Sequence, residues 1–89
     1  FPSKFYNGIM IGIPTIYFGV NDSDIGHQIK KYNIGYIVEH NNDIQGCIDF
    51  LTKFKQDSFF RKIIRENCKT FLYNENNINL IKSEWLKIL

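Results

Sequence analysis

The chain has 89 residues, 44% of them hydrophobic and 22% charged, a composition typical of a globular protein and outside the disordered range. This length allows at most one domain, which we assign to residues 1–89. Residues 1–50 hold three basic and five acidic residues (−2), whereas residues 51–89 hold eight and four (+4), with no run of five or six basic residues. We therefore interpret the basic half as a solvated helical surface rather than a nucleic-acid site, and keep a peripheral membrane contact as the other option.

The opening segment predicts a short helix followed by a buried strand. Pro2 suits a first helical turn. Gly12 favours the left-handed conformation that ends a helix, and Pro14 prevents its continuation. We expect a helix at about residues 3–11 and a strand at 13–18. The unbroken apolar run of this strand indicates burial on both faces, as in a parallel sheet.

A second helix and strand follow this first pair. Asp22 or Ser23 caps a helix at about residues 23–32, and the apolar run at 34–39 forms the second strand. Because a helix joins the two strands, we expect them to lie parallel with a right-handed crossover.

Three further helices are expected at about residues 42–55, 58–72 and 76–88. Asn41 and Asn42 are the predicted caps of the first, and Asp57 or Ser58 is the predicted cap of the second. Apolar residues recur along each helix at spacings of three and four: Ile44, Cys47, Ile48, Leu51 and Phe54; then Phe60, Ile63 or Ile64, Cys68, Phe71 and Leu72; then Ile78, Ile81, Trp85 and Ile88. The resulting order αβαβααα, with two parallel strands, defines an α/β fold class.

The start of the first helix is a candidate anion site, formed by Ser3 and Lys4. Unpaired backbone N–H groups and the positive end of the helix dipole favour a phosphate there, and Lys4 adds a full charge. Most helix N-termini bind only water, so these grounds alone leave the ligand open.

Other polar and aromatic residues give weaker signals. His27 and His40 have no carboxylate or cysteine partner at a useful sequence spacing, so we interpret both as surface residues. Helix capping explains Asp22 and Asp24. Trp85 shares a helical face with isoleucines, which favours a core position over a sugar-stacking platform.

The two cysteines, Cys47 and Cys68, have no metal-ligand spacing and lie on predicted apolar helix faces. This indicates buried free thiols in a reducing cytoplasm. The sequence contains no P-loop, GxGxxG, nucleophile elbow or zinc pattern, and no apolar run approaches the ~18 residues of a membrane span. We expect no metal site.

The order of residues along the chain indicates a protein family, which the spacing of apolar and polar residues does not. The stretch PSKFYNGIMIGIPTI resembles the PSK-x-Y-E-Y-M-A-A-G-x-P-V-I segment of GT-B glycosyltransferases, the retaining type that uses nucleotide-sugar donors. HQIKKYNIGYIV resembles the helix, glycine and strand that follow in that family, RENCK its E-N-A-R helix, and NINLIKSEWLKIL its closing helix. The resemblance covers the whole chain and implies the second half of a Rossmann-like, donor-binding C-terminal domain.

In that family, backbone amides at the matching helix start face the donor diphosphate, which assigns Ser3 and Lys4 to diphosphate binding. Asn7 stands where the family usually has a glutamate that bonds the ribose hydroxyls. An amide still forms hydrogen bonds but carries no charge, so this departure weakens ribose binding or shifts donor preference. The implied donor is a UDP- or GDP-linked sugar. No metal or other cofactor is required, because the helix dipole and Lys4 supply positive charge.

The resemblance also implies that the first half of this domain and an N-terminal acceptor domain lie outside the 89 residues. Two strands alone leave an unpaired sheet edge and apolar surface, so we expect the chain to self-associate.

Two functions remain open. The first is the donor-binding part of a cytoplasmic glycosyltransferase, at or near the inner membrane surface, that acts in cell-surface polysaccharide synthesis or on a lipid-linked sugar. The 89 residues alone would then be inactive, with no catalytic residue among them. The second is a small non-catalytic helical module that binds another protein through its exposed apolar edge.

Overall fold

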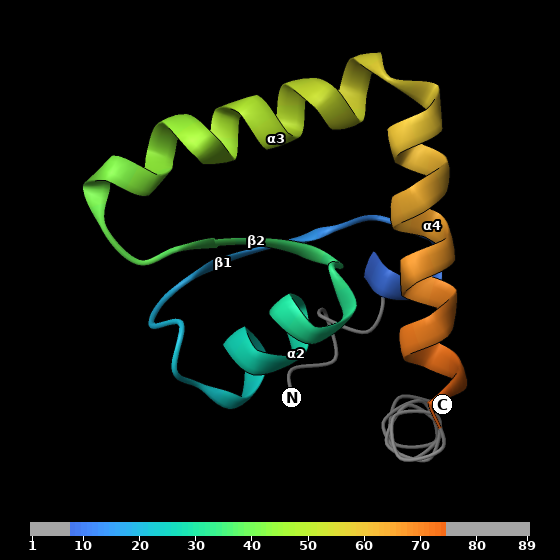
Figure 1. The fold of residues 1–89 in the computed structure, drawn as a ribbon, viewed down its shortest axis with the longest axis horizontal. Coiled ribbons are helices and arrows are strands. Elements are labelled where there is room, and N and C mark those ends of the chain that lie inside the picture. Colours follow the sequence, from blue (N-terminus) through green and yellow to red (C-terminus); the bar gives the residue numbers. More distant parts are fainter. Residues whose placement is uncertain (1–7, 75–89) are drawn as a thin grey trace.

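The computed structural model describes residues 8–74 (Figure 1). Residues 8–10 form a helical turn, and the remaining elements follow in this order: β1 (Thr15–Phe18), α2 (Asp24–Tyr32), β2 (Gly35–Val38), the 3₁₀ turn η1 (Asn41–Asp43), α3 (Ile44–Gln56) and α4 (Ser58–Tyr73). This order confirms the predicted alternation of strands and helices up to α4. The predicted helix at 76–88, and most of the one at 3–11, lie outside the described residues.

The two strands pair in parallel, as predicted, with Thr15 opposite Gly35 and Phe18 opposite Val38. β1 begins two residues later than expected. Pro14 has no N–H to donate, and the N–H of Ile13 donates instead to the carbonyl of Gly8 at 2.9 Å. The paired region is therefore only four residues long on each strand.

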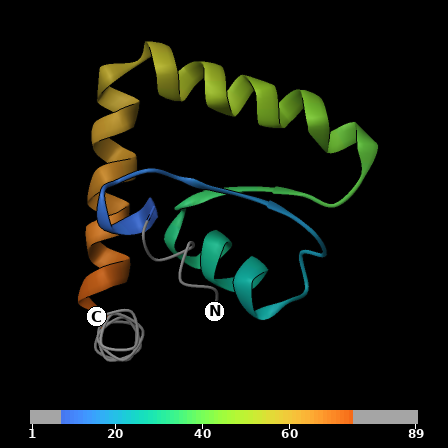
Figure 2. The same ribbon diagram turned by 180° about the vertical axis from the view of Figure 1, so that it is seen from behind.

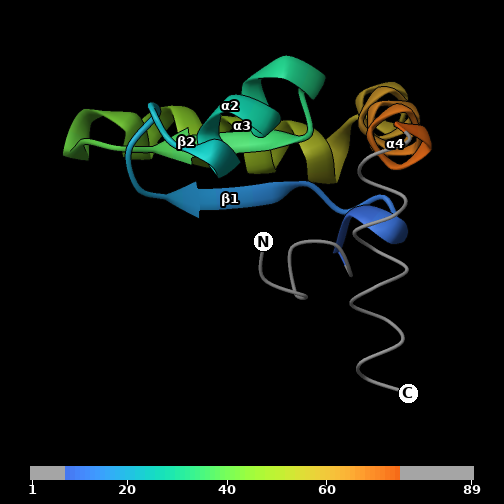
Figure 3. The same ribbon diagram turned by 90° about the horizontal axis from the view of Figure 1, so that it is seen from below.

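The helices surround the sheet unevenly. Seen from opposite sides, α2 and α3 lie on opposite faces of the sheet, and α4 stands beside the end at which the strands begin (Figures 1 and 2). Viewed from below, β1 lies at one margin, apart from α2, α3 and α4, which gather around β2 (Figure 3). This is an α/β arrangement that covers one strand better than the other.

The core lies where α4 meets α2 and the start of the sheet. Its fully buried members are Ile9, Ile29, Ile34, Ile64, Cys68 and Phe71. The rings of Tyr32 and Phe71 meet edge to face with centroids 5.2 Å apart. Of the two alternatives for the apolar stripe of α4, Ile64 is the buried one and Ile63 is exposed. Burial of an aliphatic or aromatic side chain contributes about 1.5–3 kcal/mol, so this cluster holds α4 to the rest of the fold.

Two of the observed helix caps are those predicted from the sequence, and a third is not. Ser23, not Asp22, caps α2, because its hydroxyl accepts from the N–H of Gly26 at 3.0 Å. Asp57 caps α4 by accepting from two backbone N–H groups. The expectation that Asn41 and Asn42 cap α3 is wrong, since both lie inside η1.

Burial of β1 on both faces is also wrong. Phe18 is 69% exposed, and Ile13 just before the strand is exposed too. On α3, Cys47 is buried whereas Ile44, Ile48 and Leu51 are exposed. These departures have one physical cause: within the described residues the sheet has only two strands, so β1 has a neighbour on one side alone.

Candidate functional site

The predicted anion-site residues Ser3, Lys4 and Asn7 lie outside the described residues, but the structure describes the end of the helix they would begin. Gly12 has φ of +81°, and its N–H donates to the carbonyl of Ile9 at 3.1 Å. Together with the bond from Ile13 to Gly8, this is the paired closure of a Schellman motif. Gly12 is therefore the helix terminator that the sequence predicts.

This terminator is packed against α4. A Cβ built on Gly12 would meet the side chain of Arg65, with the nearest atom at 3.2 Å. Ile9, one turn earlier, is buried in the core. The direction in which this helix enters the sheet is therefore set by the core and by α4.

Polar groups gather at the other end of the sheet, where both strands finish. The N–H of Asn21, after β1, donates to the carboxylate of Glu39, after β2, at 2.7 Å. Asp43 accepts from the N–H groups of Glu39 and His40 at 3.0 and 2.9 Å. In open α/β sheets, ligands bind at this carboxyl edge, so this cluster is the described part of the candidate site.

The two carboxylates are charged and already bonded. The Asn21 N–H lowers the pKa of Glu39, and the N–H of His40 lowers the pKa of Asp43. Since their acceptor oxygens serve backbone groups, these side chains join and shape the two loops and are poor general bases. We call these three bonds, which join Asn21, Glu39, His40 and Asp43, the clamp. Sequence analysis did not predict it. The available signal was an acidic residue three positions after His40, which fits the spacing of a helix-start motif.

Each histidine has a carboxylate partner, contrary to expectation. His27 Nε2 lies 2.9 Å from Asp22, and His40 Nε2 lies 3.0 Å from Glu39. Asp22 therefore pairs with a histidine instead of capping α2. The side chains of both histidines are more than half exposed, so the interpretation as surface residues is confirmed.

Both cysteines are free and buried, as predicted. Burial raises the pKa of the Cys68 thiol to about 11, which keeps it protonated and unreactive at neutral pH. Between residues 8 and 74, no cluster of three or more His, Cys, Asp or Glu residues could hold a metal ion. Over the same residues, no helix combines the length and apolar character needed to cross a membrane.

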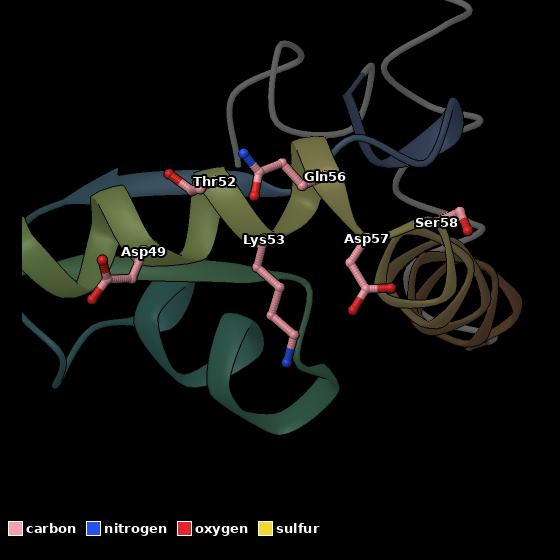
Figure 4. A pocket seen from close by; sticks show the side chains of 6 residues that line it. All are labelled: Asp49, Thr52, Lys53, Gln56, Asp57 and Ser58. Carbon is pink, nitrogen blue, oxygen red and sulfur yellow. The ribbon is translucent and has the colours of Figure 1, made fainter.

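A hollow of about 550 Å³ lies where α3 meets α4, as Figure 4 shows. Six polar side chains line it: Asp49, Thr52, Lys53, Gln56, Asp57 and Ser58. Asp57 already caps α4, and Lys53 Nζ lies 4.7 Å from the ring centroid of Phe60. Asp49 accepts from the side-chain amide of Gln45 at 3.0 Å. The charged groups of this hollow are thus engaged in the fold, and the hollow lies on the outer side of α3, away from the carboxyl edge.

Two smaller grooves flank β2 and share Asn33, Gly35 and Tyr36 in their linings. The one beside α2, about 310 Å³, includes Asn21 and Asp43 and so reaches the carboxyl-edge cluster. The other, about 420 Å³, is lined by apolar residues of α3 and α4. The groove beside α2 is the cavity most directly continuous with the clamp.

No family model, curated protein or solved structure matches the chain. The geometry described above and the resemblance of residue order are therefore the grounds for a functional proposal.

Proposed function

We propose that the chain is the second half of the donor-binding domain of a GT-B retaining glycosyltransferase, which transfers a sugar from a UDP- or GDP-linked donor. The observation that carries the proposal is the unit formed by a helix, the Gly12 terminator and a parallel strand. This unit occurs within the stretch PSKFYNGIMIGIPTI, whose residue order resembles that family.

The described end of this helix supports a phosphate site at its start. The helix ends beside the point where β1 begins, and the core holds it there through Ile9. If the residues before Gly8 continue this helix back along β1, its start would lie toward the carboxyl edge, where open α/β sheets bind ligands. The amides of Ser3 and Lys4 would then meet a donor diphosphate near the loops that Glu39 joins.

The proposed chemistry is electrostatic. Helix-start amides and the Lys4 ammonium would stabilise the charge that develops on the departing diphosphate, a role of the oxyanion-hole type. Asn7 would take the ribose contact as a neutral hydrogen-bonding group. The acceptor domain, and any contact with the inner membrane surface, belong to the same proposal as partners of this half-site.

The test is a titration of UDP and GDP into the ¹⁵N-labelled chain, followed by amide chemical shifts. A helix terminus and one exposed lysine each contribute only about 0.3–1 kcal/mol, so we expect weak binding, millimolar at best, with shifts centred on Ser3 and Lys4. Lys4→Ala should weaken binding about two- to fivefold. Lys62→Ala, which removes an exposed lysine of α4 at the opposite end of the sheet, is the matched control and should leave the affinity unchanged.

Three outcomes would argue against this function. Equal affinity of the Lys4→Ala variant and the unmodified chain would remove Lys4 from the site. Equal affinity for uridine and UDP would show that the diphosphate does not contribute to binding. Absence of shifts at tens of millimolar UDP would refute the donor-site proposal.

A second candidate is a non-catalytic interaction module. The observation that favours it is the exposed apolar surface of Phe18, Ile48 and Leu51, which a protein partner could cover. A chain that binds no nucleotide but buries this surface against another protein would support this function instead.

A further inference from the structure

Among residues 8–74, no strand covers the outer edge of β1. The N–H groups of Thr15 and Gly19 donate to β2, at 2.9 and 3.1 Å. Because backbone groups alternate in direction along a strand, the N–H and C=O groups of Ile16 and Phe18 point to the opposite side. Within the described residues, no strand pairs with that side.

In the described part of the chain, β1 carries few of the features by which proteins prevent edge-to-edge pairing. Natural edge strands carry charged residues, bulges or a covering helix. Residues 8–21 contain no charged side chain, and Figure 3 shows β1 apart from the main helices. Pro14 limits only the start of the strand, since it precedes the two outward-facing donors.

Apolar side chains continue from this edge onto α3. Tyr17 lines a cavity with Ile25 of α2, so the alternate residues Ile16 and Phe18 face the α3 side of the sheet. In Figure 4, Thr52 points toward the β1 side of α3, and Lys53 points the opposite way.

The helical period of 3.6 residues places Ile48 one turn before Thr52, and Leu51 next to Ile48 on the flank away from Lys53. Ile48 and Leu51 are both exposed, as is Phe18 at the sheet edge. The outer edge of β1 and this flank of α3 therefore present exposed apolar side chains on the same side of the sheet.

We infer that this edge binds a second copy of the chain, with β1 antiparallel to β1 about a two-fold axis. In the proposed register, Tyr17 lies opposite the second copy's Tyr17, and Ile16 lies opposite the second copy's Phe18. The N–H of each Ile16 then donates to the C=O of the opposite Phe18, and the N–H of that Phe18 donates to the C=O of Ile16. The result is a four-stranded sheet in the order β2-β1-β1-β2.

A second copy suits the surface because the surface is its own complement. An uncharged apolar edge meets its copy without like-charge repulsion, and a two-fold axis closes the assembly at two chains. The contact is a short strand with a narrow apolar flank, smaller than a standard interface, so we expect micromolar dissociation. This inference concerns the 89 residues and does not depend on the proposed nucleotide site. In the proposed glycosyltransferase, the first half of the donor-binding domain would compete with the second copy for this edge.

The first test removes one outward donor from each edge of the same sheet. Ile16→Pro deletes an N–H on the outer edge of β1 and leaves the β1–β2 ladder intact. Ile37→Pro deletes an outward N–H of β2 and is the matched control. Sedimentation equilibrium from low micromolar to near-millimolar concentration should show a dimer for the unmodified chain and for Ile37→Pro. Ile16→Pro should raise the dissociation constant at least about tenfold.

A charge variant covers the case in which Ile16→Pro fails to fold by circular dichroism. Phe18→Lys places an ammonium at an exposed position, where it costs the monomer little and puts two like charges beside the two-fold axis. It should give a folded monomer. A monomeric unmodified chain at every concentration, or a dimer that survives in every folded edge variant, would overturn the inference.

Disulfide trapping tests the register. In the proposed pairing, the Cα atoms of the two Tyr17 residues are ~4.5 Å apart, within reach of a disulfide, whereas those of the two Thr15 residues are ~13 Å apart. Cys47 and Cys68 are buried and free, so they should not compete. Mild oxidation should yield a covalent dimer from Tyr17→Cys and little from Thr15→Cys. Equal yields from both variants, or none from Tyr17→Cys, would overturn the register.

Discussion

The two long helices carry the same apolar periodicity but differ in how much of it they bury. On α4, the residues Ile64, Cys68 and Phe71 are all in the core. On α3, Cys47 is buried, whereas Ile48 and Leu51 at equivalent spacings are exposed. The sequence pattern alone does not distinguish the two helices.

The difference follows from what each helix packs against. α4 contacts α2, and Arg65 of α4 lies against Gly12, at the end of the sheet where the core is thickest. α3 packs on β2, beside a sheet of two strands. A helix is about as wide as two strands, so the stripe of α3 extends beyond the strand it covers. Periodicity identifies an apolar face, and the number of neighbouring elements decides whether that face is buried.

The largest expected effect contrasts the two helices directly. Phe71→Ala removes a fully buried ring from α4 and should lower the free energy of unfolding by about 3–5 kcal/mol. Ile48→Ala on α3 should change it by less than about 0.5 kcal/mol when measured in the monomer. Urea unfolding at low protein concentration measures both. Similar losses for the two variants would show that the stripe of α3 is buried after all.

A pair of neighbours on α4 sharpens the comparison within one helix. Ile64 is buried and Ile63 is 40% exposed, although they are adjacent and chemically identical. We expect Ile64→Ala to cost about 2–4 kcal/mol and Ile63→Ala less than about 1 kcal/mol. Urea unfolding at equal protein concentration is the measurement. A larger cost at Ile63 would mean that α4 is rotated about its axis relative to the structure.

Features that depend on near neighbours in sequence could be predicted, because the groups that form them lie within one turn. Gly12, Ser23 and Asp57 end or cap helices through bonds that span five residues or fewer. The strand direction could also be predicted, since a helix between two strands imposes it.

The Asp43 bonds of the clamp span only three and four positions, so sequence spacing could have indicated them. The contacts between distant residues could not be predicted: the bond from Asn21 to Glu39 spans 18 positions, and at the other end of β2 the bond from Asn67 to Asn33 spans 34. Such contacts depend on how elements dock, which the spacing of residues does not encode. The predicted site residues Ser3, Lys4 and Asn7 lie outside the described residues, so their roles remain predictions.

The Gly12 turn gives a smaller effect with a matched control. Gly12→Ala forces a side chain into a left-handed conformation and against Arg65, so it should cost about 1–2 kcal/mol. Gly8→Ala, in the helical turn before it, has space for a Cβ and should stabilise the chain by about 0.5–1 kcal/mol. Thermal and urea unfolding measure both changes. Effects of the same sign would contradict the Schellman closure at Gly12.

The smallest expected effect concerns pH and the clamp that links the loop after β1 to the loop after β2. Backbone N–H groups lower the pKa values of Glu39 and Asp43 below their ordinary values of 4.5 and 3.8. A lowered folded-state pKa means that the unfolded chain binds protons first on acidification. The contribution of each carboxylate is therefore complete above its ordinary pKa and is lost as the pH falls through its folded-state pKa. Asp43→Asn keeps an acceptor for the two N–H groups and removes the titrating charge.

We expect the unfolding midpoint in urea to fall between pH 6 and pH 3 in the unmodified chain, and to fall less in Asp43→Asn. Asp49→Asn is the matched control, because Asp49 lies on α3 and accepts from the side chain of Gln45 rather than from the backbone. Both groups of the clamp remain partly open to solvent, so the change should be smaller than at Gly12. Identical pH profiles for Asp43→Asn and the unmodified chain would show that the clamp orders the two loops without stabilising the fold.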